Sequence, residues 1–248
     1  MTMDLENITH ENLVEPVIFL AGELVDLCAI SSDSKTLKKW SSWFNKREIT
    51  KFISQGVYPS NEETQKEYLN HILKDRTRIT VLIKPKKKEE FVGVASLSLI
   101  DLASKECHFS MVIGERTAEP GSLFYGMETK SLLTEHAFEV LGVERINSGQ
   151  VVDLIEWQRW QILFGYQIEG LLRNHFRKGY KVYDVLMSSC LLEDYLKIKK
   201  VRRGNFWPGK KKMFELIKQL PEKTLIDDLI EWLPNQQKKY FNSVTFDF

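Results

Sequence analysis

The alternation of apolar and polar positions divides residues 17–198 into short strands and amphipathic helices. Residues 17–20 and 24–27 flank a glycine-containing turn and predict a hairpin. Ser60 is the expected N-cap of a helix, with Glu63 as its capping-box partner. Apolar positions at helical spacing predict helices at 37–44, 60–73, 125–141, 155–164 and 192–198. The remaining apolar runs predict strands at 80–83, 91–99, 106–113, 146–152, 167–172 and 182–188.

The pattern changes after Lys199, where a basic, glycine-ended stretch (199–204) looks like a linker. Apolar positions from Phe214 to Leu220 predict one further helix, and Thr224 is the expected cap of another. We therefore expect a domain over residues 1–199 and a C-terminal helical extension over residues 200–248. The extension should pack on the domain or on a second subunit.

Composition adds few constraints. Hydrophobic residues make up 43% of the 248, enough for a core, and the net charge of +1 gives no reason to expect nucleic acid or an anionic membrane as partner. The three cysteines, Cys28, Cys107 and Cys190, form no disulfide or metal-site pattern, which suits a reducing cytoplasm. No apolar run is long enough for a signal or a membrane span. We expect a cytoplasmic protein with no metal, nucleic-acid or membrane partner.

Residues 144–188 contain the most informative motifs. Their order is strand (ERIN), helix, glycine-aromatic turn (Gly165-Tyr166), strand (QIEGLLR), loop and strand (KVYDVLMS). This order resembles the C-terminal half of the GNAT acyl-CoA N-acyltransferases, in particular the branch similar to ribosomal-protein N-acetyltransferases. The resemblance implies an α/β (α+β) GNAT fold: a mixed, mostly antiparallel central sheet, splayed at the acyl-CoA site, with flanking helices.

The same resemblance implies a reaction, the transfer of an acetyl or other acyl group from acyl-CoA to a primary amine. The acceptor would be a small molecule such as a nucleotide-linked amino sugar, or else a protein N-terminus. A non-catalytic binding or assembly module with a degenerate CoA site is the remaining alternative. A homodimer is also expected.

The implied CoA site has two parts. Met111, Val112 and Ile113, before Gly114, resemble the family's apolar ending of the strand whose backbone binds pantetheine. The loop and helix start that follow would bind the pyrophosphate through free N–H groups. Phe124 stands there where a glycine is usual. The residues expected to contribute are Arg116, Gly121, Ser122, Tyr125 and Gly126.

The residues that normally transfer protons differ in this chain. The family's helix before the glycine-aromatic pair often begins with Asn and carries a Tyr acid, whereas Leu154 and Gln161 occupy these positions. Strand alternation places His108 and Glu106 on one face, opposite Phe109 and its apolar neighbours. His108 is the predicted base, because an imidazole titrates near neutrality. Glu106 is the reserve base.

The predicted acceptor residues come from two segments. Residues 40–48 resemble a helical segment of relatives that act on amino sugars, which implies that Trp43 and Asn45 line the acceptor site; core packing is the alternative for Trp43. His175 lies in the basic loop expected between the last two strands, and Asp184 belongs to a Tyr-Asp pair. Both could contact the acceptor. Asp184 could equally fix neighbouring strands, and His175 could be an ordinary surface residue.

Overall fold

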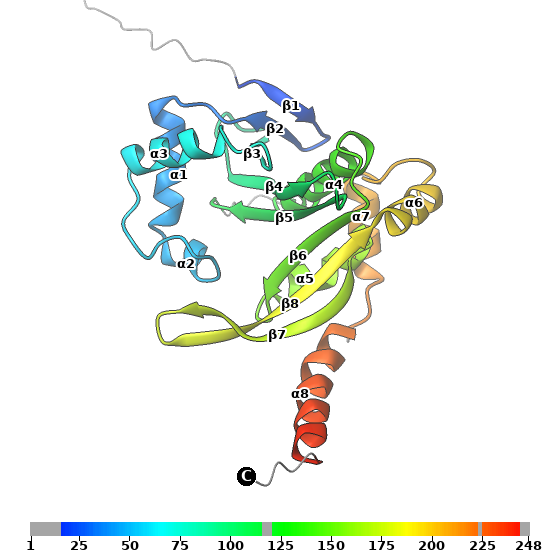
Figure 1. Cartoon of the computed structure of the whole chain (residues 1–248). Helices are drawn as coiled ribbons and strands as arrows, with labels where there is room; N and C mark the ends of the chain where they lie inside the picture. Colours follow the sequence, from blue (N-terminus) through cyan, green and yellow to red (C-terminus); the bar gives the residue numbers. More distant parts are fainter. Residues whose placement is uncertain (1–15, 116–120, 223–224, 244–248) are drawn as a thin grey trace, which may run out of the picture.

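The computed structural model describes residues 16–115, 121–222 and 225–243 (Figure 1). A single eight-stranded sheet forms its centre, in the order β1-β2-β3-β4-β5-β6-β8-β7. The strands are β1 (Ile18–Ala21), β2 (Val25–Ala29), β3 (Ile79–Pro85), β4 (Gly93–Asp101), β5 (Glu106–Ile113), β6 (Arg145–Val151), β7 (Gln167–Lys178) and β8 (Lys181–Leu191).

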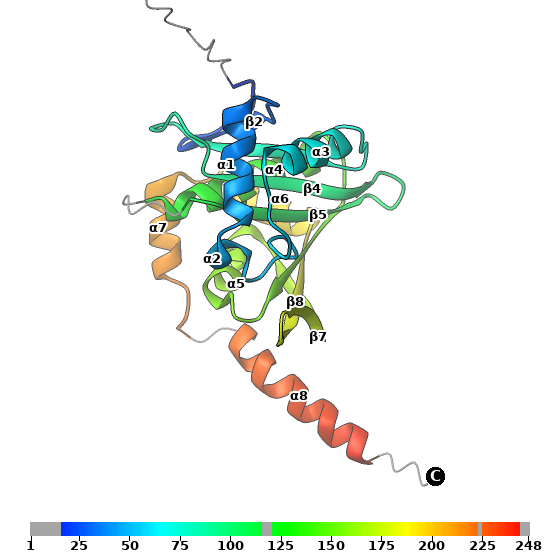
Figure 2. The ribbon, with the colours of Figure 1, turned by 90° about the vertical axis from the view of Figure 1, so that its left-hand side faces the viewer.

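Helices cover both faces of the sheet. Figure 2 shows α1 crossing one face in front of β4 and β5, with α4 behind the sheet. On the α1 face, Trp40, Trp43 and Leu69 pack against Leu82 and Val94 of the sheet. The helices are α1 (Ser34–Phe44), α2 (Arg47–Thr50), α3 (Glu62–Ile72), α4 (Leu123–Glu139), α5 (Ile155–Gln161), α6 (Leu192–Val201), α7 (Lys210–Lys218) and α8 (Leu225–Ser243), and a 3-10 turn (Ile162–Phe164) follows α5.

The sheet is antiparallel everywhere except between β5 and β6. These two parallel strands pair only at their beginnings, from Glu106 with Arg145 to His108 with Asn147. On its other edge β5 pairs with β4 as far as Ile113, and β6 pairs with β8 as far as Val151. Residues 109–113 and 148–151 therefore face each other across an opening in the sheet, which confirms the predicted mixed, splayed architecture.

Local sequence signals predicted most elements, with small errors. The N-terminal hairpin forms as expected. The N-cap of α3 lies one residue later than predicted, because Asn61 and Thr64 form the capping box that was assigned to Ser60 and Glu63. The last hairpin is longer than predicted, since residues 173–178 continue β7 rather than forming a loop. His175 therefore lies in a strand.

Part of the C-terminal extension belongs to the main core. Phe206 and Met213 are both fully buried there, among side chains of the sheet and α4. By contrast, α8 extends away from the sheet (Figures 1 and 2), and Trp232 on it is 57% exposed. The division into units at residues 199 and 200 stays a prediction. Thr224 lies outside the described residues.

Candidate active site

The opening between β5 and β6 is backed by α4 and α5. The Met111 side chain of β5 lies against Gly126 of α4, where an added Cβ would come within 2.9 Å of the methionine Cε. The Trp157 ring of α5 lies 3.7 Å from the same point. The absence of a side chain at Gly126 thus lets α4 approach the unpaired part of β5. The strand predicted to bind pantetheine and a glycine of the predicted pyrophosphate site are thus brought together.

The start of α4 carries the predicted pyrophosphate cradle. Gly121 has a φ of 101°, a left-handed conformation that favours glycine, and Ser122 is the N-cap residue. The Lys210 Nζ of α7 lies 2.3 Å from where a Cβ on Gly121 would be, so a cationic side chain from the extension covers this turn. Arg116 lies outside the described residues.

Two aromatic residues of this segment point into the core. Phe124 is 4% exposed and packs on Phe214 of α7, so its ring does not fill the turn at Gly121. Tyr125, predicted to bind the cofactor, is 8% exposed and belongs to the same core cluster. The bulky residue at the usual glycine position is therefore compatible with a backbone cradle at the helix N-terminus.

His108 lies on the α1 face of the sheet. It marks the closed end of the opening, because it is the last β5 residue paired with β6. Its neighbours across β4 are serines: Ser98 donates to the His108 carbonyl (3.4 Å), and Ser96 bonds Ser110 (2.8 Å). Burial, and then the nearby cations Lys130 and Arg78, lower the pKa of His108. The imidazole is therefore uncharged near neutral pH and able to accept a proton.

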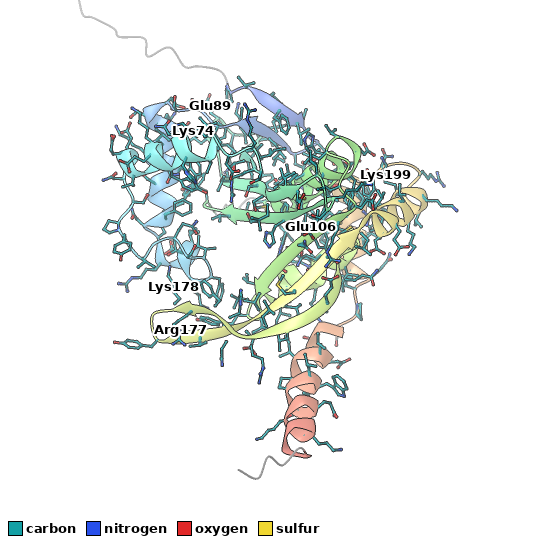
Figure 3. The ribbon with its side chains drawn as sticks, viewed as in Figure 1. Lys74, Glu89, Glu106, Arg177, Lys178 and Lys199 are labelled. Atoms are coloured by element: carbon teal, nitrogen blue, oxygen red, sulfur yellow. The ribbon has the colours of Figure 1, made fainter. Side chains whose placement is uncertain are left out.

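Glu106 is held in a polar network on the same face (Figure 3, where Glu106 is labelled). The Asn147 amide donates to its carboxylate (3.0 Å), and the Arg145 guanidinium lies 3.9 Å away. Arg145 also donates to Asn147 (2.8 Å) and forms an ion pair with Glu169, which accepts a hydrogen bond from Ser189 (2.8 Å). The reserve base is thus next to His108 but already engaged by a cation and an amide.

A buried lysine that the sequence analysis missed lies on the other side of the opening. Lys130 of α4 is fully buried, and its Nζ donates to Oε1 of Gln161 (2.7 Å). Gln161 in turn donates to Gln150 of β6, and Gln150 donates to Ser148. Gln161, at the position where the family resemblance implies a Tyr acid, is therefore an amide that connects a buried amine to β6. Lys130 falls on the stripe Gly126, Lys130, Leu133, Ala137, a helical spacing that could have marked it as buried.

Trp43 and Asn45 have defined partners. Trp43 is 1% exposed, its Nε1 donates to Glu115 (3.0 Å), and its ring lies where a side chain at Gly114 would be. Trp43 therefore packs against the end of β5. The side-chain amide of Asn45 donates to the Ser60 carbonyl (2.6 Å) and accepts from the Ser60 N–H (2.8 Å). Asn45 fixes the segment that leads into α3.

The β7–β8 hairpin carries the other two predicted acceptor residues. His175 is exposed on β7, and Asp184 accepts a hydrogen bond from the Asn174 N–H (2.7 Å), which fixes the neighbouring strand. Lys178, labelled in Figure 3, donates to the carbonyls of Ile53 (3.0 Å) and Gln55. The hairpin is thereby tied to the segment that follows α2.

The described residues provide little else that resembles a ligand site. A hollow of about 620 Å³ opens between α6 and α7, and none of its lining residues belongs to the predicted site. Within the described ranges, no group of three or more His, Cys, Asp or Glu side chains is placed to hold a metal ion. None of the described helices combines the length and the apolar character needed to span a bilayer.

Comparison with known proteins relates about half of the chain to a family. Residues 29–151 match the family model described as an acetyltransferase (GNAT) domain. No curated protein matches the chain.

Solved structures of acetyltransferases share the fold. A spermidine N-acetyltransferase from Vibrio cholerae, in complex with CoA and spermine, has a TM-score of 0.61 at 18% identity over 70% of this chain and 98% of that one. Microcin C7 self-immunity acetyltransferase MccE, in complex with acetyl-CoA and AMP, has a TM-score of 0.57 at 18% identity over 69% and 94%. A structure described as an acetyltransferase of T. thermophilus has a TM-score of 0.59 at 24% identity over 82% and 97%. Residues 29–151 thus match an acetyltransferase (GNAT) domain, and the chain has the fold of solved acetyltransferases.

Proposed function

We propose that the protein transfers an acetyl group from acetyl-CoA to a small primary amine, with His108 as the base. The observation that carries this proposal is the opening between β5 and β6, with a neutral, half-buried imidazole at its closed end. Backbone N–H and C=O groups left without strand partners are ready to bind an extended polar chain such as pantetheine. Met111, Val112 and Ile113 supply them on β5.

The arrangement can accelerate the reaction in two ways. Holding thioester and amine side by side can lower the barrier by about 7–11 kcal/mol. A positioned base adds about 10²–10⁴-fold by taking a proton from the acceptor ammonium, which must be neutral to attack. His108 suits this role because its lowered pKa keeps it uncharged near pH 7.

A small-molecule acceptor has two supports. Residues 40–48 resemble those of relatives that act on amino sugars, and a nucleotide-linked amino sugar is the narrower candidate. Solved structures with the same fold include enzymes named for spermidine and for microcin C7. A protein N-terminus is the second candidate acceptor, supported by the resemblance of residues 144–188 to ribosomal-protein N-acetyltransferases.

Two measurements test the proposal. Acetyl-CoA should raise the melting temperature, because a ligand that binds only the folded state stabilises it, by about 2.7 kcal/mol at a hundredfold excess over Kd. When labelled acetyl-CoA is incubated with a panel of amino sugars, polyamines and N-terminal peptides, the label should be transferred to one class of acceptor. If acetyl-, propionyl- and longer acyl-CoA all leave the melting temperature unchanged, the proposal is wrong, and a non-catalytic module becomes the better account.

Three further expectations go with this function. A homodimer is proposed, and sedimentation equilibrium of the full chain would test it. A cytoplasmic location is proposed, and cell fractionation would test it. Independence from metal is proposed, and unchanged turnover after chelation would support it.

A further inference from the structure

Lys130 has an unusual environment for a lysine. Its side chain is fully buried between α4, α5 and the sheet, with the Nζ 3.4 Å from the Tyr166 ring centroid and 4.4 Å from that of Phe109. Gln161 accepts one hydrogen bond from this Nζ. Within the described part of the chain, Lys130 forms no ion pair with a carboxylate. A buried ammonium without a counter-ion is costly, so the site favours either the neutral amine or the arrival of a negative charge.

The titratable groups around Lys130 do not supply that charge. Burial raises the pKa of Cys190 to about 12, and it raises the pKa of Tyr166 well above its usual range, so both are uncharged at neutral pH. His108, on the opposite face, carries no negative charge in either protonation state. Burial holds the pKa of Lys130 itself well below its usual range. Burial therefore disfavours the ammonium form of Lys130, and an anion that comes close would favour it.

The position of Lys130 relates it to the opening in the sheet. Phe109, whose ring it contacts, is the first β5 residue beyond the last pair with β6. Gln161, which it bonds, donates to Gln150 on the unpaired part of β6. Lys130 thus connects to both strands at the point where they separate. Gly126, one helical turn earlier, lies against Met111 further along the same opening. A chain that runs from the α4 N-terminus along β5 would bring its far end to Lys130.

We propose that Lys130 stabilises the CoA sulfur as a thiolate, acting through the hydrogen-bonded Gln161 and Gln150 amides at the opening. This inference rests on the proposed acetyl transfer. Lys130 donates to the side-chain oxygen of Gln161, so this oxygen faces the lysine. The amide N–H groups of Gln161 and Gln150 are directed toward β6. The positive ends of both amide dipoles thus point away from Lys130 and toward Gln150 and Ser148 of β6, the strand that borders the opening where the sulfur would lie.

The protons balance as follows. The acceptor ammonium loses two protons as its nitrogen forms the C–N bond of the amide, the first to His108 and the second, in the end, to the sulfur. The C–S bond breaks and its electron pair remains on sulfur, so a thiolate forms near a lysine ammonium. The sulfur takes up this second proton before CoA leaves as the thiol, and Lys130, which is fully buried, keeps its own protons throughout.

The test measures the pKa of the thiol of CoA bound to the full-length protein, from the ultraviolet absorbance of the thiolate across pH. In the wild type we expect this pKa to lie about one to three pH units below that of CoA in solution, the range expected for an opposite charge nearby. Lys130→Met should return it to the solution value. Gln161→Glu is nearly isosteric and keeps the lysine. It should also return the thiol pKa to the solution value, because the new carboxylate acts as the counter-ion of Lys130.

Two controls separate this role from a structural one. Lys74→Met, at an exposed position after α3, should leave the thiol pKa at the wild-type value. Circular dichroism shows which variants fold, and calorimetry shows which variants bind CoA. If Lys130→Met does not fold, the thiol pKa in Gln161→Glu tests the inference. Equal thiol pKa values in wild type and in a variant that binds CoA would overturn the inference and leave the acetyl-transfer proposal intact. Absence of CoA binding to the wild type would overturn both.

Discussion

The ring of Phe124 meets the ring of Phe214 edge to face, with the centroids 6.4 Å apart. Phe124 lies in the first turn of α4, beside the predicted pyrophosphate cradle, and Phe214 lies in α7 of the extension. Lys210, at the start of α7, covers Gly121 at the same place. The extension therefore takes part in shaping the candidate cofactor site, although it lies outside the segment that matches the acetyltransferase (GNAT) domain.

Truncation of α7 side chains should destabilise the whole domain. Met213→Ala removes a fully buried side chain from the main core, and we expect a loss of about 2–5 kcal/mol in the free energy of unfolding, measured in urea. Trp232→Ala, on the exposed side of α8, is the matched control and should change stability by less than about 0.5 kcal/mol. A Met213→Ala protein as stable as the control would show that α7 is a detachable appendage.

Lys210 should contribute to acetyl-CoA affinity without affecting chemistry. Lys210→Met is expected to raise KM for acetyl-CoA about tenfold at unchanged kcat, because a hydrogen bond to a charged group contributes about 1.5 kcal/mol or more. Steady-state kinetics with acetyl-CoA checks this. Acetyl-pantetheine, which lacks the phosphates, is the control substrate. If the substitution weakens both substrates equally, Lys210 does not act on the phosphates.

A side chain at Gly114 should disturb Trp43. The Cβ of Gly114→Ala would lie 2.1–2.5 Å from atoms of the indole ring, so the ring or β5 must move, at a cost of about 1–3 kcal/mol. We expect a lower melting temperature and a changed tryptophan fluorescence. Gly170→Ala is the matched strand control, since its Cβ would meet nothing within 4 Å. Equal behaviour of the two variants would argue against close packing of Trp43 on Gly114.

Lys178 should hold the β7–β8 hairpin to the segment after α2. Lys178→Met removes hydrogen bonds to the carbonyls of Ile53 and Gln55, each contributing about 0.5–1.5 kcal/mol. Amide hydrogen exchange of residues 174–181 should become faster. Lys181→Met, at the exposed tip of the same hairpin, should leave exchange unchanged. Unchanged exchange in both variants would mean that other contacts hold the hairpin.

The pH dependence of turnover should report His108. Because its pKa is lowered, the imidazole stays neutral to a lower pH than a free histidine, and the acid limb of kcat/KM should have its midpoint below about 6.5. The same shift makes the fold lose stability as the pH falls from about 6.5 through the lowered pKa, since protonation favours the unfolded chain. His108→Gln should remove both effects. An acid limb that persists in this variant would exclude His108 as the base.

The helices and strands of the fold could be predicted from the sequence, because they depend on local signals. Apolar periodicity predicted the strands from β3 to β6, and Gly165 marked the left-handed turn after α5. Alternation along β5 correctly separated His108 from the core side chains Phe109 and Met111.

The site depends on contacts between distant segments, which local signals do not contain. The direction of the Phe124 ring is set by α7, some ninety residues later in the chain. Asn45 was predicted to line the acceptor site, yet its amide is bound to Ser60. Lys130 was missed because a lysine in a helix is ordinarily exposed, and only its partners on α5 and β5 show why this one is buried.

The separation of β5 from β6 after His108 also has a consequence for handling the protein. Two internal strands each present an edge of unpaired backbone groups, which in other proteins is a template for association with a further extended chain. A pantetheine chain lying in the opening would occupy the edge of β5 with its own amides. The protein without acyl-CoA should therefore self-associate more readily than the protein with acyl-CoA bound. Its solubility when it is concentrated would depend on the fraction of molecules that carry acyl-CoA.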